Sequence, residues 1–521
     1  MVIDPGGQEA GSPPAPIEPG ISPGAVRGLT SALGDYASVT GARLGSVLLS
    51  LASILLTTRI LAPADYAALA YVSVVATLVF AGSAWTATAV SRYGREELEL
   101  GRTMRSVTWS RAALVLPPLA AATALLLGLE LLGALPVEFS RTLAGLALLT
   151  ALALVVGEHV SSLLEAAGRM RLSAVGWVVR HAAVVATLLV IYVTGAGDSV
   201  AVIAAATVIA STLVAVALAS RVWRAGFWPP AWDPALLRRI TLFSLPLVAF
   251  TVSQYVMASV DLIVIRAFAS ARDAGVYAVA YQGYSVLQQL AGASIVVLVP
   301  LLVSLRMANR EASIRRYLER VVLQLVFLAA VVVGMAAPLV PIIVSLVFPD
   351  AFEAAAEPLT VLMGALVLFF GASLLAPILV LHESTRAIGL ATTAAALTNV
   401  VGDIVLVGAF GLELLGAALA TTTALAIICG SYFVIARRLA GSGAKAQPFV
   451  LTPLLPGILA TLLLPTGWAL AAGILGTLAA ALLVLRIWKP FEAADADLIE
   501  HLDLPLPLKR LALRGLAVVA R

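Results

Sequence analysis

The feature that most constrains the fold is a series of long apolar segments that runs along almost the whole chain. These segments recur from residue 37 to residue 488 and are separated by short loops that carry arginine. A helix needs about 20 predominantly apolar residues to cross the hydrocarbon core of a bilayer. We therefore predict an all-α, polytopic membrane protein with about 14 transmembrane helices and without a sizeable soluble domain. The predicted spans are residues 37–61, 68–91, 106–134, 142–165, 172–194, 199–222, 241–265, 274–303, 318–347, 357–381, 386–408, 414–436, 449–464 and 467–488.

The composition argues against several classes of protein. Hydrophobic residues make up 61% of the 521 residues and charged residues only 12%, which is too little polar surface for a water-soluble fold. The net charge is +4 and the basic residues lie in loops, so we expect no nucleic acid partner. The single cysteine, Cys429, cannot form an intramolecular disulfide, and the scattered histidines form no metal-binding pattern. The sequence has no Walker A motif and no Ser/His/Asp motif, so we expect neither a cofactor nor an enzymatic activity.

The distribution of positive charge predicts the orientation in the membrane. Loops with several arginines alternate with loops that have few cations, and the loop at residues 348–356 is acidic. Cytoplasmic loops are enriched in Lys and Arg, so we place the arginine-bearing loops and both termini in the cytoplasm of a bacterial cell, with the protein in the inner membrane. Residues 1–30 are predicted to be a disordered tail. Residues 491–521 are predicted to be a second cytoplasmic tail, either solvated or folded as an amphipathic helix on anionic lipid.

An internal repeat divides the chain into two similar parts. Three pairs of segments share an offset of roughly 210 residues, which is typical of a duplicated unit. Each unit holds six crossings, and this even number keeps both units in the same orientation, related by an axis along the membrane normal. We expect the substrate path to lie between them. The pairs are 58–71 with 265–281, 166–176 with 382–392, and 194–207 with 408–421. The predicted parts are an N-terminal half (31–224), a C-terminal half (225–440) and two extra helices (441–490).

Motifs in these repeats also carry a family resemblance. They are Arg59-Ile-Leu-Ala-Pro63-Ala-Asp65-Tyr66, Phe243-Ser-Leu-Pro246, Asp261, Gly275-Val-Tyr277 with Ala280-Tyr281, and Gly411 through Gly416-Ala417-Ala418. In their order and spacing over residues 30–440 they resemble Wzx-type polysaccharide and O-antigen flippases of the multidrug/oligosaccharidyl-lipid/polysaccharide (MOP) superfamily. The resemblance implies a MATE-like fold of two parallel six-helix repeats plus two C-terminal helices.

The resemblance also implies a function. A transporter of this kind moves a polyprenyl-diphosphate-linked oligosaccharide from the inner to the outer leaflet for assembly of surface polysaccharide such as lipopolysaccharide. The implied partners are this substrate, membrane lipids, and a polysaccharide polymerase and glycosyltransferases. Such flippases are expected to have a strongly cationic pocket, whereas this sequence places few arginines at mid-membrane depth. The alternatives are a multidrug or metabolite antiporter of the same fold and a membrane-embedded polysaccharide polymerase or ligase.

Ionisable residues inside predicted spans are candidates for function because a charge in hydrocarbon is costly unless it is paired. Glu158 and His159 lie in the fourth span, and Arg180 and His181 lie in the fifth. Counted from the hairpin near Arg169, Glu158 and Arg180 are at the same depth, about 16 Å at 1.5 Å per residue. We predict that they pair. The pair is either a structural ion pair or a site at which arginine meets phosphate and Glu158, His159 or His181 carries a coupling proton.

Five other residues are candidates for substrate binding or coupling. Arg43 in the first span either extends toward lipid headgroups or receives substrate phosphate. Asp261 and Asp403 either line a cavity, where they bind sugar or a proton, or bond to neighbouring backbone. Gln254 and Gln282 either bind sugar or hold helices together.

Overall fold

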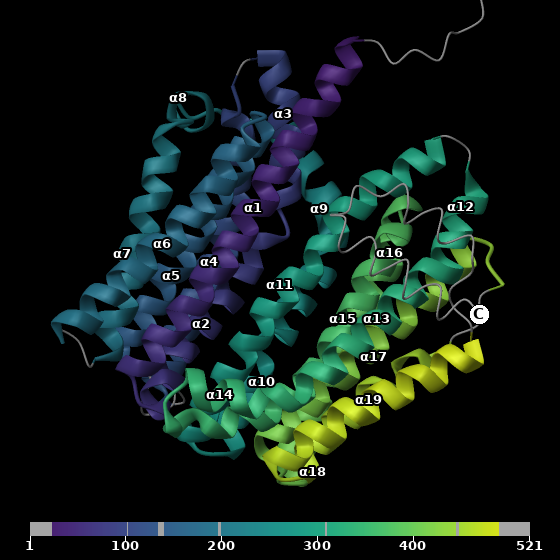
Figure 1. Cartoon of the computed structure of the whole chain (residues 1–521). Coiled ribbons are helices and arrows are strands. Elements are labelled where there is room, and N and C mark those ends of the chain that lie inside the picture. Colours follow the sequence, from purple (N-terminus) through teal and green to yellow (C-terminus); the bar gives the residue numbers. More distant parts are fainter. Residues whose placement is uncertain are drawn as a thin grey trace, which may run out of the picture.

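The protein is an all-α bundle of membrane-length helices, seen here in a computed structural model (Figure 1). The structure describes residues 23–101, 103–133, 140–195, 199–307, 310–443 and 447–488. Within these residues, 12 helices are long and apolar enough to cross a membrane. The 37-residue helix α11 (Ala271–Met307) and the short helix α18 (Leu454–Leu463) occupy the other two predicted spans. The chain is therefore a multi-pass membrane protein.

The first half of the chain forms one bundle of six long helices, which Figure 1 shows on the left. These helices are α1 (Pro23–Ile60), α2 (Pro63–Ala84), α4 (Arg105–Leu131), α5 (Arg141–Ala166), α6 (Met170–Thr194) and α7 (Val200–Ser220). Two shorter helices, α3 (Ala87–Gly101) and α8 (Trp223–Gly226), connect them. Within the bundle α1 packs on α6, α2 packs on α5, and α7 packs on both α5 and α6.

Two boundaries in this half differ from the prediction. Helix α1 begins at Pro23, so residues 23–30 are helical and do not belong to a disordered tail. Proline suits the first turn of a helix because the backbone N–H groups there have no partner within the helix, so the N–H that proline lacks is not missed. Helix α2 begins at Pro63 and ends at Ala84, earlier than the predicted span of 68–91. The remainder of that span turns at Trp85 and continues as the amphipathic α3. The rest of the predicted N-terminal tail and the tail at 491–521 lie outside the described residues.

The second half repeats this arrangement with more interruptions. Its elements are α9 (Pro234–Met257), α10 (Val260–Phe268), α11, α12 (Glu311–Arg316), η1 (Tyr317–Val321), α13 (Val322–Ala336), η2 (Ala337–Leu339), α14 (Val340–Val347), η3 (Asp350–Ala355), α15 (Ala356–Leu381), α16 (Thr385–Asp403), η4 (Ile404–Ala409) and α17 (Glu413–Leu439). The span predicted at 241–265 is divided at Ala258 and Ser259 into α9 and α10. Helix α15 packs between α11 and α17, and α9 contacts α16 as well as α2 and α4 of the first half.

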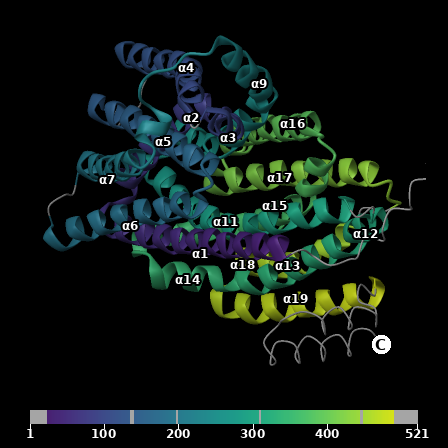
Figure 2. The ribbon, with the colours of Figure 1, turned by 90° about the horizontal axis from the view of Figure 1, so that it is seen from above.

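The C-terminal helices lie at the edge of the second half. After the short η5 (Pro448–Leu451), helices α18 and α19 (Thr466–Trp488) pack on each other and on α13. Glycines allow this contact, because a Cβ atom on Gly457 would lie 1.8 Å from the carbonyl oxygen of Gly334. Figure 2 shows α19 far from the helices of the first half. As expected from the repeat, the two extra helices stand outside the region between the halves.

The two halves contact each other along α9 and also, more tightly, at one end of the bundle. We call the end with α3, α8 and α12 the arginine-rich end, and the end with the α1–α2 and α10–α11 turns the opposite end. At the opposite end the Tyr66 hydroxyl donates to Gln282 Oε1 across the halves (2.8 Å), and the Tyr66 ring meets that of Phe352 edge-on at 5.7 Å. Gly275 touches the backbone of Pro63 so closely that a Cβ atom there would lie 1.8 Å from the Pro63 carbonyl oxygen. The opposite end is therefore closed by direct backbone contact.

This contact predicts a conformational effect of one methyl group. Gly275→Ala should disfavour closure of the opposite end, because the added carbon overlaps a backbone atom that cannot rotate away. Spin labels at Ala64 and Arg272, in a protein whose only cysteine is changed by Cys429→Ala, should report longer distances in this variant. Gly283→Ala is the matched control, since its nearest neighbours are Leu359 methyl groups at 3.8 Å. Identical distance distributions for Gly275→Ala and the parent protein would contradict the assignment of this contact as the closure.

Candidate functional site

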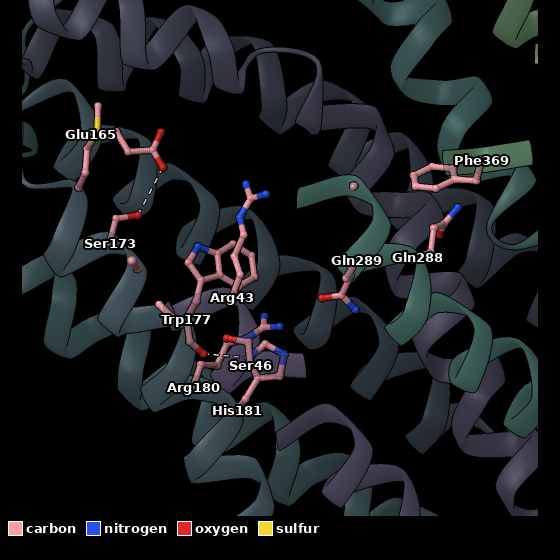
Figure 3. A pocket seen from close by; sticks show the side chains of 14 residues that line it. Arg43, Ser46, Glu165, Ser173, Trp177, Arg180, His181, Gln288, Gln289 and Phe369 are labelled. Atoms are coloured by element: carbon pink, nitrogen blue, oxygen red, sulfur yellow. Dashed lines mark hydrogen bonds between the residues drawn. The ribbon is translucent and has the colours of Figure 1, made fainter. Parts of the chain in front are cut away.

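A cavity of about 790 Å³ lies between the two halves, on the side of the arginine-rich end. Its walls come from α1, α5 and α6 of the first half and from α11 and α15 of the second. Figure 3 shows Arg43, Trp177, Arg180 and His181 on one wall, facing Gln288, Gln289 and Phe369 on the other. Both helix bundles therefore contribute residues to the lining of one cavity.

Two arginines give this cavity its positive charge. The Arg180 guanidinium lies over the Trp177 ring, 5.0 Å from its centroid, and the Nδ1–H of His181 donates to the Trp177 carbonyl (2.8 Å). Arg43 comes from the neighbouring helix α1 and is exposed to the cavity. Neither guanidinium forms an ion pair with a carboxylate in the described part of the chain. The carboxylate of Glu165, on the same wall, instead accepts hydrogen bonds from Ser91 (3.3 Å) and Ser173 (3.4 Å).

The cavity continues toward the opposite end as two smaller compartments of about 380 and 200 Å³. Arg180, His181 and Gln289 border both the main cavity and the first compartment, so the space is continuous. We call the two compartments together the hydroxyl chamber, because most of their polar lining is serine and threonine. Its polar residues beyond that border are Ser50, Ser53, Thr57, Tyr66, Ser73, Thr77, Thr150, Thr207, Ser211, Gln282 and Ser285.

Glu158 pairs with a residue that the sequence analysis did not select. The Nη2–H of Arg111, on α4, donates to Glu158 Oε2 at 2.5 Å, and its Nε–H donates to Thr86 Oγ1 at 2.9 Å. Arg111 is only 2% exposed and the side chain of Glu158 is 20% exposed, so this ion pair is largely but not fully enclosed by protein. The predicted pair of Glu158 with Arg180 is therefore wrong. The two residues share a depth, but Glu158 is turned toward α4 and Arg180 toward the cavity.

His159 belongs to the same network. A guanidinium can only donate, so the contact of 3.1 Å between Arg111 Nη1 and His159 Nδ1 makes Nδ1 the acceptor. The other ring nitrogen, Nε2, then carries the proton and donates to Thr108 Oγ1 (3.1 Å). Because every polar atom of the imidazole is engaged inside the first half, this arrangement favours a structural role for His159.

A second buried polar cluster joins α10, α11, α16 and α17 in the second half. Asp261 Oδ2 accepts from the hydroxyls of Tyr277 and Thr421, the latter at 2.7 Å. The Asn399 amide donates to Asp261 Oδ1 (3.1 Å) and to Asp403 Oδ2 (3.3 Å). Asp261 and Asp403 are 2% and 0% exposed, and no Lys or Arg of the described chain forms an ion pair with either. Two oxygens, Asn399 Oδ1 and Asp403 Oδ1, are buried without a hydrogen-bond partner.

Comparison with known proteins identifies the family. The model of a family described as polysaccharide biosynthesis protein matches residues 33–306, more than half of the chain. The chain belongs to this family. No curated protein sequence matches it.

Solved structures agree with this family in fold. The lipid II flippase MurJ in an inward closed conformation superposes with a TM-score of 0.64 at 15% identity, covering 86% of this chain and 98% of MurJ. An inward-facing multidrug resistance MATE transporter of the MOP superfamily gives 0.57 at 14% identity, covering 78% and 98%. The eukaryotic MATE transporter AtDTX14 gives 0.56 at 14% identity, covering 80% and 98%. At these identities the likeness shows a shared MATE-like fold.

The structure distributes the predicted site residues of this family member over three places. The cavity and its chamber contain Arg43, Arg180, His181 and Gln282. Glu158 and His159 belong to the hydrogen-bonded group around Arg111, which we call the Arg111 network. Asp261 and Asp403 belong to the buried polar cluster of the second half, which we call the acidic cluster. Gln254 is exposed on α9 and is absent from the lining of the cavity and chamber.

The Arg111 network predicts a large loss of stability when its cation is removed. Arg111→Ala leaves Glu158 buried without its partner, so the free energy of unfolding should fall by about 3–5 kcal/mol. Arg95→Ala is the matched control, because the Arg95–Glu99 pair is 55% and 62% exposed and should contribute about 0–1 kcal/mol. The measurement is equilibrium unfolding in mixed micelles with increasing SDS. Equal effects of the two substitutions would contradict a stabilising role for the Arg111 network.

Proposed function

We propose that this polysaccharide biosynthesis protein is a transporter that flips a polyprenyl-diphosphate-linked oligosaccharide across the membrane. The observation that carries the proposal is the pair Arg43 and Arg180, which border one cavity between two parallel halves and form no ion pair with a carboxylate among the described residues. Glycosyltransferases that build the substrate and a polymerase that consumes it are the expected functional partners. The resulting glycan would serve surface polysaccharide assembly, such as that of O-antigen.

Electrostatics supports this choice of substrate. A diphosphate that leaves the aqueous surface for a cavity between apolar helices loses hydration, which is unfavourable unless cations replace it. Arginine forms two parallel hydrogen bonds with phosphate, and these are stronger than hydrogen bonds between neutral groups. Arg43 and Arg180 have these donors available. A multidrug antiporter for organic cations would instead require free carboxylates, whereas Glu165 on this wall is already bonded by two serines.

The direction of transport follows from the orientation we propose. The positive-inside rule places the arginine-rich end, and with it both termini, in the cytoplasm of a bacterial cell. The cavity then faces the inner leaflet of the inner membrane, while the closed opposite end faces the outside. This is the state in which a substrate made in the cytoplasm would enter.

We further propose that the acidic cluster couples transport to an ion gradient. The Asn399 amide donates to both Asp261 and Asp403, and two buried carboxyl groups held this close cannot readily both be ionised. Burial without a counter-charge also favours uptake of a proton. The unpartnered Asp403 Oδ1 and Asn399 Oδ1 are acceptors for that proton or for a small cation. The cluster ties α10 to α16 and α17 close to the α10–α11 turn, so its occupancy can alter closure at the opposite end.

If Arg43 and Arg180 together form the receptor for the substrate diphosphate, their substitution should have a clear phenotype. Arg43→Ala or Arg180→Ala should lower polymer output at least about tenfold, because a hydrogen bond to a charged group contributes about 1.5–3 kcal/mol. Arg→Lys should restore it only in part, since lysine lacks the planar pair of donors. Polymer is measured in a deletion strain complemented with each variant and normalised to membrane protein level. Arg141→Ala, at an exposed ion pair with Glu130, is the control. Full output from both alanine variants would exclude these arginines as the receptor.

Coupling predicts a response to pH that one substitution removes. With spin labels at Ala64 and Arg272, the distance between the halves should change as the pH is raised from about 7 to about 10 and the cluster loses its proton. Asp403→Asn should abolish the response, because an amide cannot release that proton. Asp65→Asn, at an exposed acid of the opposite end, should retain it. A wild-type response to sodium at constant pH would identify a cation as the occupant, and a pH response that persists in Asp403→Asn would reject the cluster as the coupling site.

A further inference from the structure

Six of the nine serine and threonine hydroxyls that line the hydroxyl chamber are turned toward their own helices. Six hydroxyls donate to carbonyl oxygens three or four residues earlier in the chain. A hydroxyl that donates to its own helix keeps only its lone pairs for a ligand. These bonds run from Ser50 to Ser46 (2.8 Å), Thr57 to Ser53 (2.8 Å), Ser73 to Leu69 (3.3 Å), Thr150 to Leu146 (2.7 Å), Thr207 to Ile203 (2.8 Å) and Ser285 to Gln282 (2.8 Å). The chamber is therefore rich in acceptors that come from α1, α2, α5, α7 and α11.

One donor is fixed among these acceptors. The Tyr66 hydroxyl donates to Gln282 Oε1 at 2.8 Å, so the amide of Gln282 is held with its oxygen toward α2. Its Nε2 group is then the end left for a ligand, and Gln282 borders both compartments of the chamber. A ligand that fits must offer many hydroxyl donors and a few acceptors, which is the pattern of a sugar ring.

Charge in the chamber is confined to the border with the main cavity. Arg180 and His181 stand at that border, and the described residues that line the chamber beyond it include no Asp, Glu or Lys. A carboxylate inside the chamber would face hydroxyl lone pairs and find no cation of its own. Burial of such an unpaired charge is costly, whereas a neutral hydroxyl can donate to each of these oxygens.

We propose that the hydroxyl chamber holds the glycan of the substrate and selects neutral sugars over sugars that carry a carboxylate. The proposal rests on the function proposed above, because a diphosphate at Arg43 and Arg180 directs the attached glycan across the shared border into the chamber. Thr150 and Thr207 are then specificity-determining residues, which bind sugar hydroxyls through their own hydroxyl oxygens.

The test uses three synthetic probes that share a short prenyl diphosphate. One carries no sugar, one carries a neutral disaccharide, and one carries the same disaccharide with a uronic acid as the outer unit. Affinities for the purified full-length protein in detergent are measured by calorimetry. The neutral disaccharide should improve binding at least about tenfold over the sugar-free probe, since several neutral hydrogen bonds each contribute a factor of about 2 to 10. The uronic acid should cancel this improvement.

Variants separate the chamber from the phosphate receptor. Thr150→Val and Thr207→Val keep the side-chain shape but remove the hydroxyl, so each should weaken the neutral probe about 2-fold to 10-fold and leave the sugar-free probe unchanged. Thr398→Val is the control, because this hydroxyl makes the same type of bond, to Ala394 (3.0 Å), at an exposed position outside the chamber. The ratio of neutral to sugar-free affinity is compared within each variant and does not depend on the strength of the phosphate contact.

The outcomes distinguish the two proposals. Equal binding of the neutral and uronate probes, or an equal effect of Thr150→Val on all three probes, would overturn the chamber assignment. Failure of the neutral probe to bind the wild-type protein would overturn it as well. Unchanged binding of the sugar-free probe to Arg43→Ala and Arg180→Ala would instead reject the phosphate receptor, whatever the sugar ratio shows.

Discussion

A charged side chain loses several kcal/mol of hydration when it enters a bundle of apolar helices, and something must replace that hydration. This structure meets the requirement in three ways. Glu158 compensates Arg111 inside the first half, and neutral hydrogen-bond donors stabilise Asp261 and Asp403 in the second. Arg43 and Arg180 border the cavity and form no ion pair with a carboxylate in the described part of the chain, although Glu165 on the same wall interacts with Arg43 at longer range. Charges compensated by the protein thus belong to its scaffold or its coupling machinery, and uncompensated charges mark the place for an anionic ligand.

The parallel arrangement of the halves explains why one cavity can serve two functions along its length. Its end near the α5–α6 turn is cationic, and its deeper part is neutral and rich in hydroxyls. A lipid-linked glycan has the same order of chemistry, with a diphosphate next to the lipid and sugars beyond it. The extra helices α18 and α19 add surface to the second half without narrowing this space.

The sequence was sufficient to locate the helices but not to predict how each helix is rotated about its own axis. Hydropathy located the spans, because each crossing must be apolar over its full length. Counting residues from the hairpin predicted a shared depth for Glu158 and Arg180 but gave no information about the direction of their side chains. The direction in which a side chain points, however, turns by about 100° around the helix axis with each residue. Which neighbouring helix a given side chain faces depends on helix packing, which hydropathy does not encode. The sequence analysis therefore paired Glu158 with Arg180, when the partner is Arg111.

The other site residues that the sequence analysis missed are brought together by contacts between segments far apart in the chain. The sequence analysis did not select Arg111, although an ionisable residue more than a turn inside a predicted helix was the available signal. Asp261 and Asp403 were recognised one by one, but Asn399 and Thr421 bring them together only through contacts between helices. The hydroxyl chamber was invisible in sequence, since serine and threonine are common in helices of this kind and only their convergence is informative.

The hydrogen bond between Tyr66 and Gln282 has a consequence for release of the cargo. Its two partners belong to different halves, so any motion that parts the halves at the opposite end must break it. The amide of Gln282 then loses its fixed orientation, and the acceptors on α1, α2, α5 and α7 move away from those on α11. The glycan site therefore exists as a complete site only while the exit is shut. Opening the exit dismantles the site, so affinity falls at the moment of delivery without a separate trigger for release.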